Sequence, residues 1–473
     1  MRYIPFILLA AASSVSAAPV GTPLNPIPDL NQNSIREHVQ DTEKQPAPEP
    51  QAPVQMSEEQ LLQQPALLLN ALDTAVGQQN TDNIRFLLPL YRRLPAEQQD
   101  PVLAEYAEAI LLRADGRHDA AEQKLRQILE RNPEFSPVRL QLALTQSQNG
   151  KQREAAAEIA QIRQTPDLPA PVAQYLDQYL DQYEQYLNRE RAWQFSGNAY
   201  YLQDNNVARA PEQRTYGAWQ FNEPQSAHGI GYEFSAQKTT PVKGHWAARV
   251  QAALYGKFYW DAHAYDDLVA RAEAGPVWRD ARQEIYAAPF YEQRWYGTEP
   301  FSRQFGGSIH YSRTLSPNWQ MYAAWQSGYK QHNERTFLNG ASHTGSLTLL
   351  YRTSPQQYFV MGIGGGQENA KDPSDAYRKS SLHGGWTRHW GNNRAFATSL
   401  NISVQRRNYR GPDIFNIQRR DTEYFTRLSL SHSRLSWKGF TPRLNWTWPH
   451  IHSNHFYYRY NNHRVFLDIF KQF

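Results

Sequence analysis

Residues 193–473 alternate between apolar and polar side chains, and this period of two constrains the fold more than any other feature of the chain. Within 394–408, for example, Phe396 and Ile402 share one parity, whereas Ser399 and Ser403 take the other. Successive side chains of a β-strand point to opposite faces, so the pattern predicts strands with one apolar and one polar face. It recurs in fourteen segments, at 194–203, 227–237, 244–259, 264–277, 281–293, 301–315, 319–332, 340–352, 356–367, 376–390, 394–408, 421–436, 441–453 and 463–473.

A soluble β-sandwich would alternate as well, but the lengths of the segments and connections favour a transmembrane barrel. Many segments have ten or more residues, which suits strands that cross a membrane at a tilt. The connections alternate between tight turns and longer loops: turns at 315–318, 353–355, 390–393 and 437–439, and loops at 204–226, 368–374 and 409–419. Because outer-membrane barrels have short turns on one rim and long loops on the other, we predict a 14-stranded antiparallel outer-membrane β-barrel over 193–473.

An even number of strands places both ends of the barrel on one side of the membrane, which we expect to be the periplasmic side. Tryptophans occur beside the expected periplasmic turns, at positions 278, 319, 390 and 437, where an aromatic girdle belongs. The last segment alternates up to a terminal phenylalanine. This pattern is similar to the signal that the barrel-assembly machinery reads, and the residues concerned are Val465, Leu467, Ile469 and Phe473.

The start of the chain is typical of an exported protein. Residues 1–17 combine a basic Arg2, an apolar stretch and the small residues Val15-Ser16-Ala17, so we predict a signal peptide cleaved before Ala18. The chain has no cysteine, which excludes disulfides, thiolate metal sites and an N-terminal lipid-modified cysteine. Residues 18–56 are rich in proline and poor in apolar residues, and we expect a linker without a packed core.

Residues 57–192 have helical patterning that repeats at an offset of 34 residues. Small residues recur in register: Ala109, Gly116 and Ala121 are followed by Ala143, Gly150 and Ala155. This is the period of tetratricopeptide repeats, in which paired helices pack through small residues, and 68–101 is a candidate leading repeat. Such arrays bind peptides or proteins on a concave face, which the register would line with Tyr106, Arg113, Leu140 and Leu144. An ordinary pair of helical hairpins, with these residues in inter-repeat packing, is the alternative.

Several short motifs resemble those of a known family. They are Asp115-Gly116-Arg117, Asp204-Asn205-Asn206, Arg419-Arg420-Asp421, the segment 439–444 with Pro442, Ser453-Asn454 and the terminal Phe473. Together they resemble the surface lipoprotein assembly modulators (Slam) of Neisseria and relatives over nearly the whole mature chain. The resemblance implies an outer-membrane translocon that moves lipoproteins, such as iron-scavenging receptors, to the cell surface.

The sequence contains no phosphate-binding glycine loop, no Gly-x-Ser-x-Gly and no zinc-ligand helix motif, so we expect neither an enzyme nor a cofactor. Four histidines gather near the last loop, at His450, His452, His455 and His463, but without an acidic residue among them or a diagnostic spacing. We expect loop or lumen histidines rather than a metal site. In an exported barrel, paired arginines such as Arg406-Arg407 do not indicate nucleic-acid binding.

The function that these features favour is protein secretion without catalysis. The periplasmic repeats would capture a client lipoprotein or its chaperone, and the barrel, which meets outer-membrane lipid, would pass the client to the surface through its lumen or along its seam. An exporter of an anionic exopolysaccharide is the alternative, because the barrel segment has 32 lysines and arginines against 20 acidic residues, a charge of +12. A diffusion porin would not need a peptide-binding array.

Overall fold

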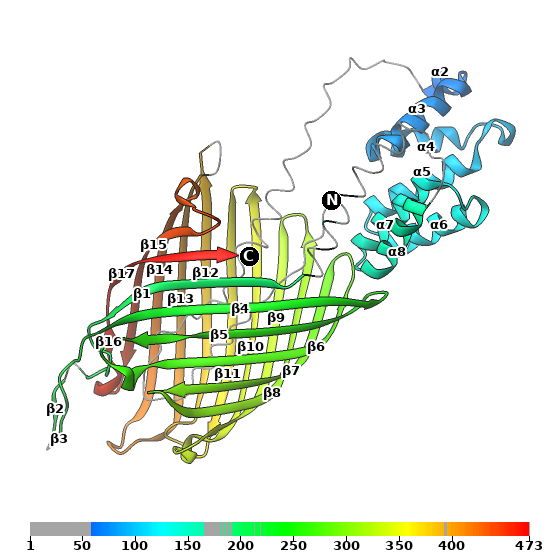
Figure 1. Cartoon of the computed structure of the whole chain (residues 1–473). Coiled ribbons are helices and arrows are strands. Elements are labelled where there is room, and N and C mark those ends of the chain that lie inside the picture. The colour runs from blue at the N-terminus through cyan, green and yellow to red at the C-terminus, as the bar shows by residue number, and fades with distance from the viewer. Residues whose placement is uncertain are drawn as a thin grey trace.

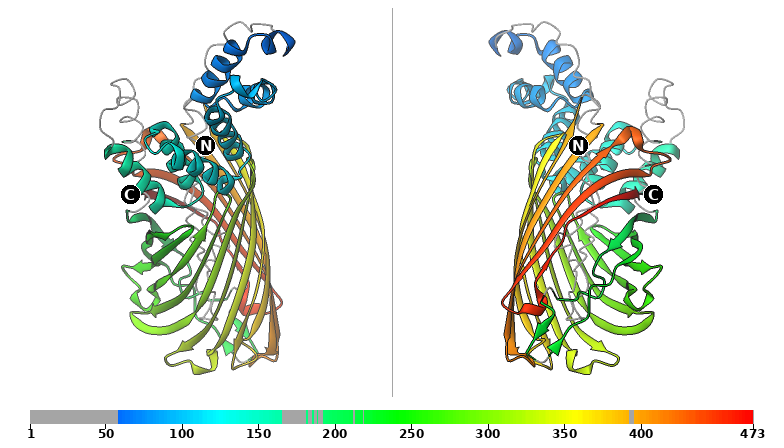
Figure 2. Two further views of the ribbon diagram at one scale, coloured as in Figure 1. Left: turned by 90° about the vertical axis from the view of Figure 1, so that its right-hand side faces the viewer. Right: turned by 90° about the vertical axis from the view of Figure 1, so that its left-hand side faces the viewer.

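The computed structural model describes residues 58–164, 192–211, 213–217, 219–391 and 395–472, together with 181, 185 and 188. A helical region is followed by a β-barrel, and the helices lie against one end of it (Figures 1 and 2). The expected signal peptide, the expected linker and Phe473 lie outside the described residues.

The helical region consists of consecutive antiparallel hairpins behind a short first helix. Its helices are α2 (Glu58–Leu62), α3 (Pro65–Gly77), α4 (Thr81–Tyr91), α5 (Pro101–Ala114), α6 (His118–Arg131), α7 (Ser136–Gln148) and α8 (Gln152–Gln164). The pairs α5/α6 and α7/α8 are the two repeats found by the 34-residue offset, and α3/α4 occupies the place of the leading repeat. Aliphatic side chains between the helices form the core, and none of the described helices is long and apolar enough to cross a membrane.

Local sequence sets the helix boundaries. The Asp100 side chain accepts hydrogen bonds from the backbone N–H groups of Val102 (2.8 Å) and Leu103 (3.4 Å) and so caps α5. At the ends of α5 and α7 the chain turns through Gly116 (φ 76°) and Gly150 (φ 80°), a left-handed backbone that glycine adopts without steric cost.

The barrel contains the predicted fourteen antiparallel strands. They are β1 (Gln194–Asp204), β4 (Ala227–Lys243), β5 (Trp246–Tyr259), β6 (Asp267–Arg279), β7 (Gln283–Tyr296), β8 (Glu299–Ser316), β9 (Trp319–His332), β10 (Gly340–Ser354), β11 (Gln357–Ala370), β12 (Tyr377–Trp390), β13 (Phe396–Pro412), β14 (Gln418–His432), β15 (Thr441–Ser453) and β17 (Arg464–Gln472). Each pairs with its neighbour in sequence, and β17 pairs with β1 to close the sheet. The short hairpin β2 (Thr215–Tyr216)/β3 (Trp219–Gln220) forms a separate sheet, and β16 (Tyr460–Asn461) pairs with β15 just before β17 begins.

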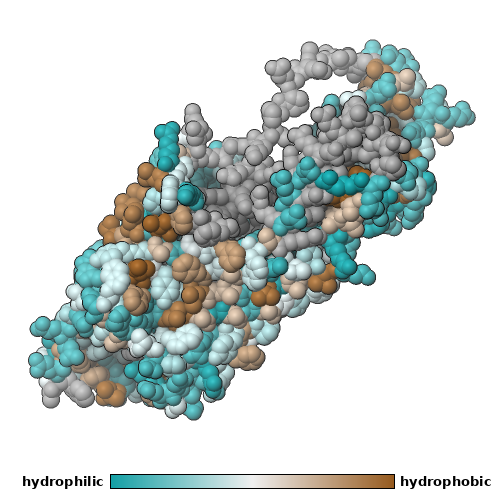
Figure 3. All heavy atoms as spheres, in the orientation of Figure 1, coloured by the Kyte–Doolittle hydropathy of each residue, from teal (hydrophilic) through white to brown (hydrophobic). Residues whose placement is uncertain are grey.

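The alternation of the strands is confirmed, with the apolar face outward. Ile309, Ile402 and Leu382 are exposed on the wall, whereas Ser403 and Arg407 are buried inside it. Apolar and pale side chains cover the middle of the visible barrel wall, and hydrophilic ones predominate at the end far from the helices (Figure 3). A surface that exposes large apolar residues around a charged interior is the reverse of a water-soluble barrel and is what a bilayer requires.

The connections on the two rims differ in length as expected, with three corrections to the predicted boundaries. The turn between β7 and β8, on the long-loop rim, consists of Gly297 and Thr298 alone; both have positive φ (59° and 72°), which is the geometry of a tight two-residue hairpin. On the same rim, the loop expected at 409–419 shrinks to 413–417 because β13 and β14 extend into it. On the short-turn rim, the twelfth strand ends at His432 rather than 436, since a 3-10 turn, η4 (Ser433–Leu435), intervenes.

Candidate functional site

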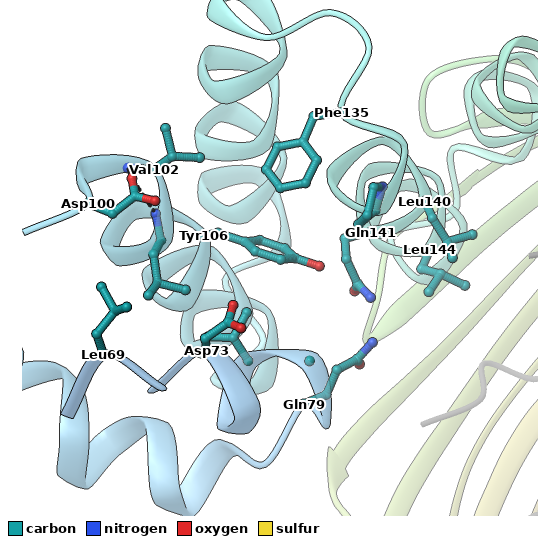
Figure 4. A pocket seen from close by; sticks show the side chains of 14 residues that line it. Leu69, Asp73, Gln79, Asp100, Val102, Tyr106, Phe135, Leu140, Gln141 and Leu144 are labelled. Atoms are coloured by element: carbon teal, nitrogen blue, oxygen red, sulfur yellow. Dashed lines mark hydrogen bonds between the residues drawn. The ribbon is translucent and has the colours of Figure 1, made fainter. Parts of the chain in front are cut away.

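A groove on the inner face of the helical region is the candidate functional site. The first helix of each hairpin, α3, α5 and α7, contributes to its wall, and its volume is about 380 Å³ (Figure 4). The lining residues are Leu69, Asp73, Val76, Gly77, Gln79, Asp100, Val102, Leu103, Tyr106, Phe135, Pro137, Leu140, Gln141 and Leu144. Tyr106, Leu140 and Leu144, which the repeat pattern assigned to a concave face, are among them.

Aromatic and aliphatic side chains form the floor of the groove. Tyr106 and Phe135 lie with their ring centroids 6.4 Å apart and their planes tilted by 59°, so the two rings form a tilted aromatic pair. Leu140 and Leu144, four residues apart on α7, continue the apolar surface. An amphipathic peptide segment, with apolar side chains toward this floor, matches such a surface.

Three of the four residues expected on the concave face, Tyr106, Leu140 and Leu144, line the groove, and Arg113 lies behind it. The Arg113 guanidinium is buried and donates hydrogen bonds to the side-chain oxygens of Gln141 (2.5 Å) and Gln79 (2.6 Å). Both amides line the groove, so Arg113 fixes their orientation between consecutive hairpins. A buried guanidinium needs such partners, because an unpaired one would lose its hydration without compensation.

The sequence pattern missed the half of the groove that α3 supplies. Among the residues lining this groove, Asp73 and Asp100 have carboxyl side chains, and none is a lysine, arginine or histidine. Asp73 comes from the hairpin α3/α4, where Ala75 keeps the 34-residue offset but no glycine matches Gly116. A repeat that lacks the defining small residues gives no register from which a lining residue can be assigned.

The small residues that define the repeats lie where helices meet. The four predicted packing alanines are almost completely buried: Ala109, Ala121, Ala143 and Ala155. The two predicted glycines have a second role, because the turns that contain them meet the short-turn rim of the barrel, Gly116 at Arg282 and Gly150 at Arg279. Arg282, in the turn between β6 and β7, donates a hydrogen bond to the carbonyl oxygen of Asp115 (3.3 Å).

The second glycine turn and α8 meet the same rim. His245, in the turn between β4 and β5, lies with Nδ1 2.9 Å from the carbonyl oxygen of Asn149. The backbone N–H of Gly244 donates to the Glu154 carboxylate (2.7 Å), and Arg153 donates to the carbonyl oxygen of Val242 (3.0 Å). The helical region is thereby held at two barrel turns, a contact that no sequence motif indicated.

A charged cluster beside this contact joins α6 to the second glycine turn. The Lys151 ammonium lies 2.8 Å from Asp119 and 2.7 Å from Glu122. Burial opposes ionisation of Glu122, but the hydrogen bonds from Lys151, Arg126 and Gln146 and the charge of Lys151 together outweigh it and lower the pKa of the carboxyl group. Burial, with Arg113 and Arg282 nearby, lowers the pKa of His118 to about 4, so this imidazole is neutral at physiological pH.

Three of the family motifs lie at the long-loop rim: Asp204-Asn205-Asn206, Arg419-Arg420-Asp421 and Ser453-Asn454. Asp204, at the end of β1, forms an ion pair with Arg464 of β17 (3.0 Å), and Asn205 and Asn206 form the turn that follows. Asn454, directly after β15, is bound to the start of β14, because its side chain accepts from the backbone N–H of Arg420 (2.7 Å) and donates to the carbonyl oxygen of Gln418 (2.9 Å).

The remaining motif residues stabilise the same rim or the wall. Asp421 pairs with Arg419 (2.7 Å), and the Ser453 hydroxyl accepts from the backbone N–H of His455 (3.0 Å). Pro442 lies in β15 opposite Ile469. The alternating residues expected to act in barrel assembly, Val465, Leu467 and Ile469, point outward from β17.

The histidines near the last loop do not converge. His455 lies 2.6 Å from an oxygen of Asp413, whereas His450 and His463 lie beside the ring of Trp448. Within the described part of the chain, no group of three or more histidine, cysteine or acidic residues could hold a metal ion.

Comparisons with known proteins identify the family. The family model described as "Surface lipoprotein assembly modifier" matches residues 193–473, and the model of its N-terminal TPR repeats matches 54–159. Surface lipoprotein assembly modifier 1 of Haemophilus influenzae is 31% identical over 88% of this chain and 87% of its own length. Its namesake in Neisseria meningitidis serogroup B is 29% identical over 98% and 95%, respectively. The Vibrio cholerae outer-membrane protein OmpT aligns with 60% of this chain and 99% of its own, at a TM-score of only 0.32 and 5% identity. The chain therefore belongs to the surface lipoprotein assembly modifier family and is an outer-membrane protein.

Proposed function

We propose that this protein is an outer-membrane translocon that delivers lipoproteins to the cell surface, with its helical repeats in the periplasm. The observation that carries the proposal is the groove on α3, α5 and α7, held over the short-turn rim of the barrel by two glycine turns. The names of the curated relatives concern surface lipoproteins, and the family match gives no support to polysaccharide export. The role requires no catalytic step.

The chemistry of the groove narrows what it captures. Its floor is aromatic and aliphatic, and its lining contains two carboxyl side chains and no basic one. An extended or helical segment with apolar anchors and a basic residue is complementary to such a surface. That segment belongs either to a client lipoprotein or to a periplasmic chaperone that holds one. During its own biogenesis the barrel would engage the barrel-assembly machinery.

The proposal is tested by protease shaving of cells that express a candidate lipoprotein with this protein. Leu144→Glu places a carboxylate in the acidic groove and should reduce surface-exposed lipoprotein, while the barrel still inserts. Glu130→Lys, on an exposed position of α6, is the matched control and should leave display unchanged. If Leu144→Glu leaves the surface display of the lipoprotein undiminished, the groove takes no part in its export. Unchanged lipoprotein display and lost polysaccharide export on deletion of the whole chain would overturn the proposal.

The orientation of the barrel needs its own test. The proposal places the long-loop rim outside the cell and the helices in the periplasm. A tag inserted at Ile414, which is 82% exposed between β13 and β14, should be accessible to antibody on intact cells. A tag at Asn318, in the turn between β8 and β9, should become accessible only after the outer membrane is permeabilised. The opposite result would invert the topology.

A further inference from the structure

The wall of the barrel is incomplete along one seam. β1 pairs with β4 along its whole length, from Gln194 to Asp204. Its pairing with β17 covers five residue pairs, from Ser196↔Gln472 to Tyr200↔Asp468. Among the described residues of the two strands, register pairing stops there, although β1 continues to Asp204 and β17 begins at Arg464. The outer part of the seam, 201–204 facing 464–467, is therefore a gap in the hydrogen-bonded wall.

Side chains close this gap on the lumen side. The Arg464 guanidinium lies 3.0 Å from the Asp204 carboxylate, and both side chains are mostly buried. Arg464 also donates to the hydroxyl of Tyr460 (3.0 Å), and the rings of Tyr200 and Phe466 lie 5.0 Å apart across the seam. On the outer side, Val465, Leu467 and Tyr201 are exposed, as expected of a surface in contact with lipid.

The interior of the barrel is unsuited to an acyl chain. Buried ion pairs face the lumen, such as Arg249–Glu284 (2.7 Å), Lys330–Glu368 (2.8 Å) and Arg294–Asp267 (2.7 Å). Each methylene group that is buried in the bilayer stabilises an acyl chain there. This stabilisation would be lost if the acyl chain lay among the charged side chains of the lumen. A lipid anchor that stays in the bilayer, attached to a polypeptide inside the lumen, requires that the chain cross the barrel wall.

We propose that the outer part of the β1–β17 seam is where the lipid-linked segment of the client crosses the wall, and that the Asp204–Arg464 pair closes it at rest. The inference rests on the proposed function and adds the route by which the lipid-linked segment of the client leaves the barrel. An ion pair and a ring contact separate without breaking a backbone ladder. The facing edges, 201–204 and 464–467, then offer backbone groups to an extended client segment in the manner of an added strand.

The absence of natural cysteine makes a direct test possible. Tyr201→Cys with Leu467→Cys places one thiol on each side of the gap, facing outward, and a short bis-reactive thiol crosslinker applied to the full-length protein in cells closes it. Leu382→Cys with Val404→Cys is the matched control, because these residues form a registered pair between β12 and β13. Surface lipoprotein is measured by protease shaving before and after linking.

We expect linking across the gap to lower newly displayed lipoprotein at least tenfold relative to the same variant unlinked, and linking of the control pair to change it less than twofold. Equal display after both linkages would overturn the seam route and leave the proposed function standing. If the unmodified chain itself does not increase display, the proposed function falls and the seam route falls with it.

A second measurement does not depend on closing the seam. A photo-crosslinking amino acid at Leu467 should form adducts with a client during its export, whereas the same amino acid at Leu382, equally outward on a fully paired strand, should not. Adducts at Leu382 but not at Leu467 would overturn the proposal.

Discussion

Ile128 and Ile402 have the same side chain in opposite surroundings. Ile128 lies in α6 and is 0% exposed, whereas Ile402 lies in β13 and is 51% exposed on the outside of the barrel. Charged residues show the reverse: Lys330 and Arg249 are buried inside the barrel against glutamates. In both regions apolar side chains avoid water, but the helical region is surrounded by water and the barrel wall by lipid. Burial within the protein is therefore a guide to an apolar residue's contribution in the helices, but not in the barrel wall, where lipid replaces protein.

The largest expected effect comes from truncating the buried isoleucine. Ile128→Ala removes methylene groups from a closed core and leaves a cavity, so we expect the free energy of unfolding of the helical region to fall by roughly 2–5 kcal/mol. Ile402→Ala is the control, and we expect less than about 1 kcal/mol because acyl chains fill the space. Urea unfolding of the whole protein in micelles, followed by far-ultraviolet circular dichroism, measures the free energy lost in Ile128→Ala. Equal losses at both positions would contradict a lipid-facing Ile402.

A charge at the lipid-facing position should have a slightly smaller effect. Ile402→Arg places a guanidinium on the outer wall, and we expect a cost of about 2–4 kcal/mol if the residue lies near the middle of the bilayer. Ile414→Arg, on the long-loop rim, should cost almost nothing, since that side chain is already in water. Guanidinium unfolding in lipid vesicles, followed by tryptophan fluorescence, compares the two. A tolerated Ile402→Arg would place β13 outside the membrane.

The same contrast explains which parts of the fold could be predicted from the sequence. A period of two extends over each strand, so the number of strands and their faces were predictable, Ile402 among them. Strand ends were less so, because β14 ends at His432 where a 3-10 turn begins, and the sequence continues to alternate beyond it. The sequence pattern did not predict the two-residue turn Gly297-Thr298, which lies on the rim where longer loops were expected.

The candidate site was predictable only where the repeat is regular. The 34-residue offset located Tyr106, Leu140 and Leu144, but it gave no register for Asp73 in the degenerate first hairpin. It also assigned Gly116 and Gly150 to turns without indicating that they meet the barrel. Contacts between segments more than a hundred residues apart, such as Arg282 with Asp115, have no periodic signature.

The pH dependence of stability should also separate the two regions. Burial, with Arg113 and Arg282 nearby, holds the pKa of His118 at about 4 in the folded protein, below the 6.5 of the unfolded chain. Between these values the unfolded state takes up a proton that the folded state does not. The stability contribution is therefore present above pH 6.5 and is lost as the pH falls toward 4.

We expect the helical region to lose roughly 1–3 kcal/mol over this interval. His118→Gln removes the titrating group and should flatten the profile, which urea unfolding at a series of pH values measures. Acidic groups such as Glu122, whose pKa is lowered, lose their contribution only at lower pH. An unchanged slope in His118→Gln would assign the pH dependence to another residue.

The smallest expected effect concerns the contact between the two regions, and the two glycine turns provide a matched pair. Both glycines have positive φ, so alanine costs about 1–2 kcal/mol at either position. A Cβ on Gly150 would lie 2.6 Å from the backbone oxygen of Arg279, which cannot move without distorting β6. A Cβ on Gly116 would meet the far end of the Arg282 side chain, which can rotate away. Gly150→Ala should therefore loosen the helices from the barrel more than Gly116→Ala does, although the backbone strain is equal.

Spin labels on Glu130 and Asn318 would report this as a broader distance distribution for Gly150→Ala alone. Equal broadening in both variants would mean that backbone strain, and not the approach to β6, decides how firmly the groove is held over the rim.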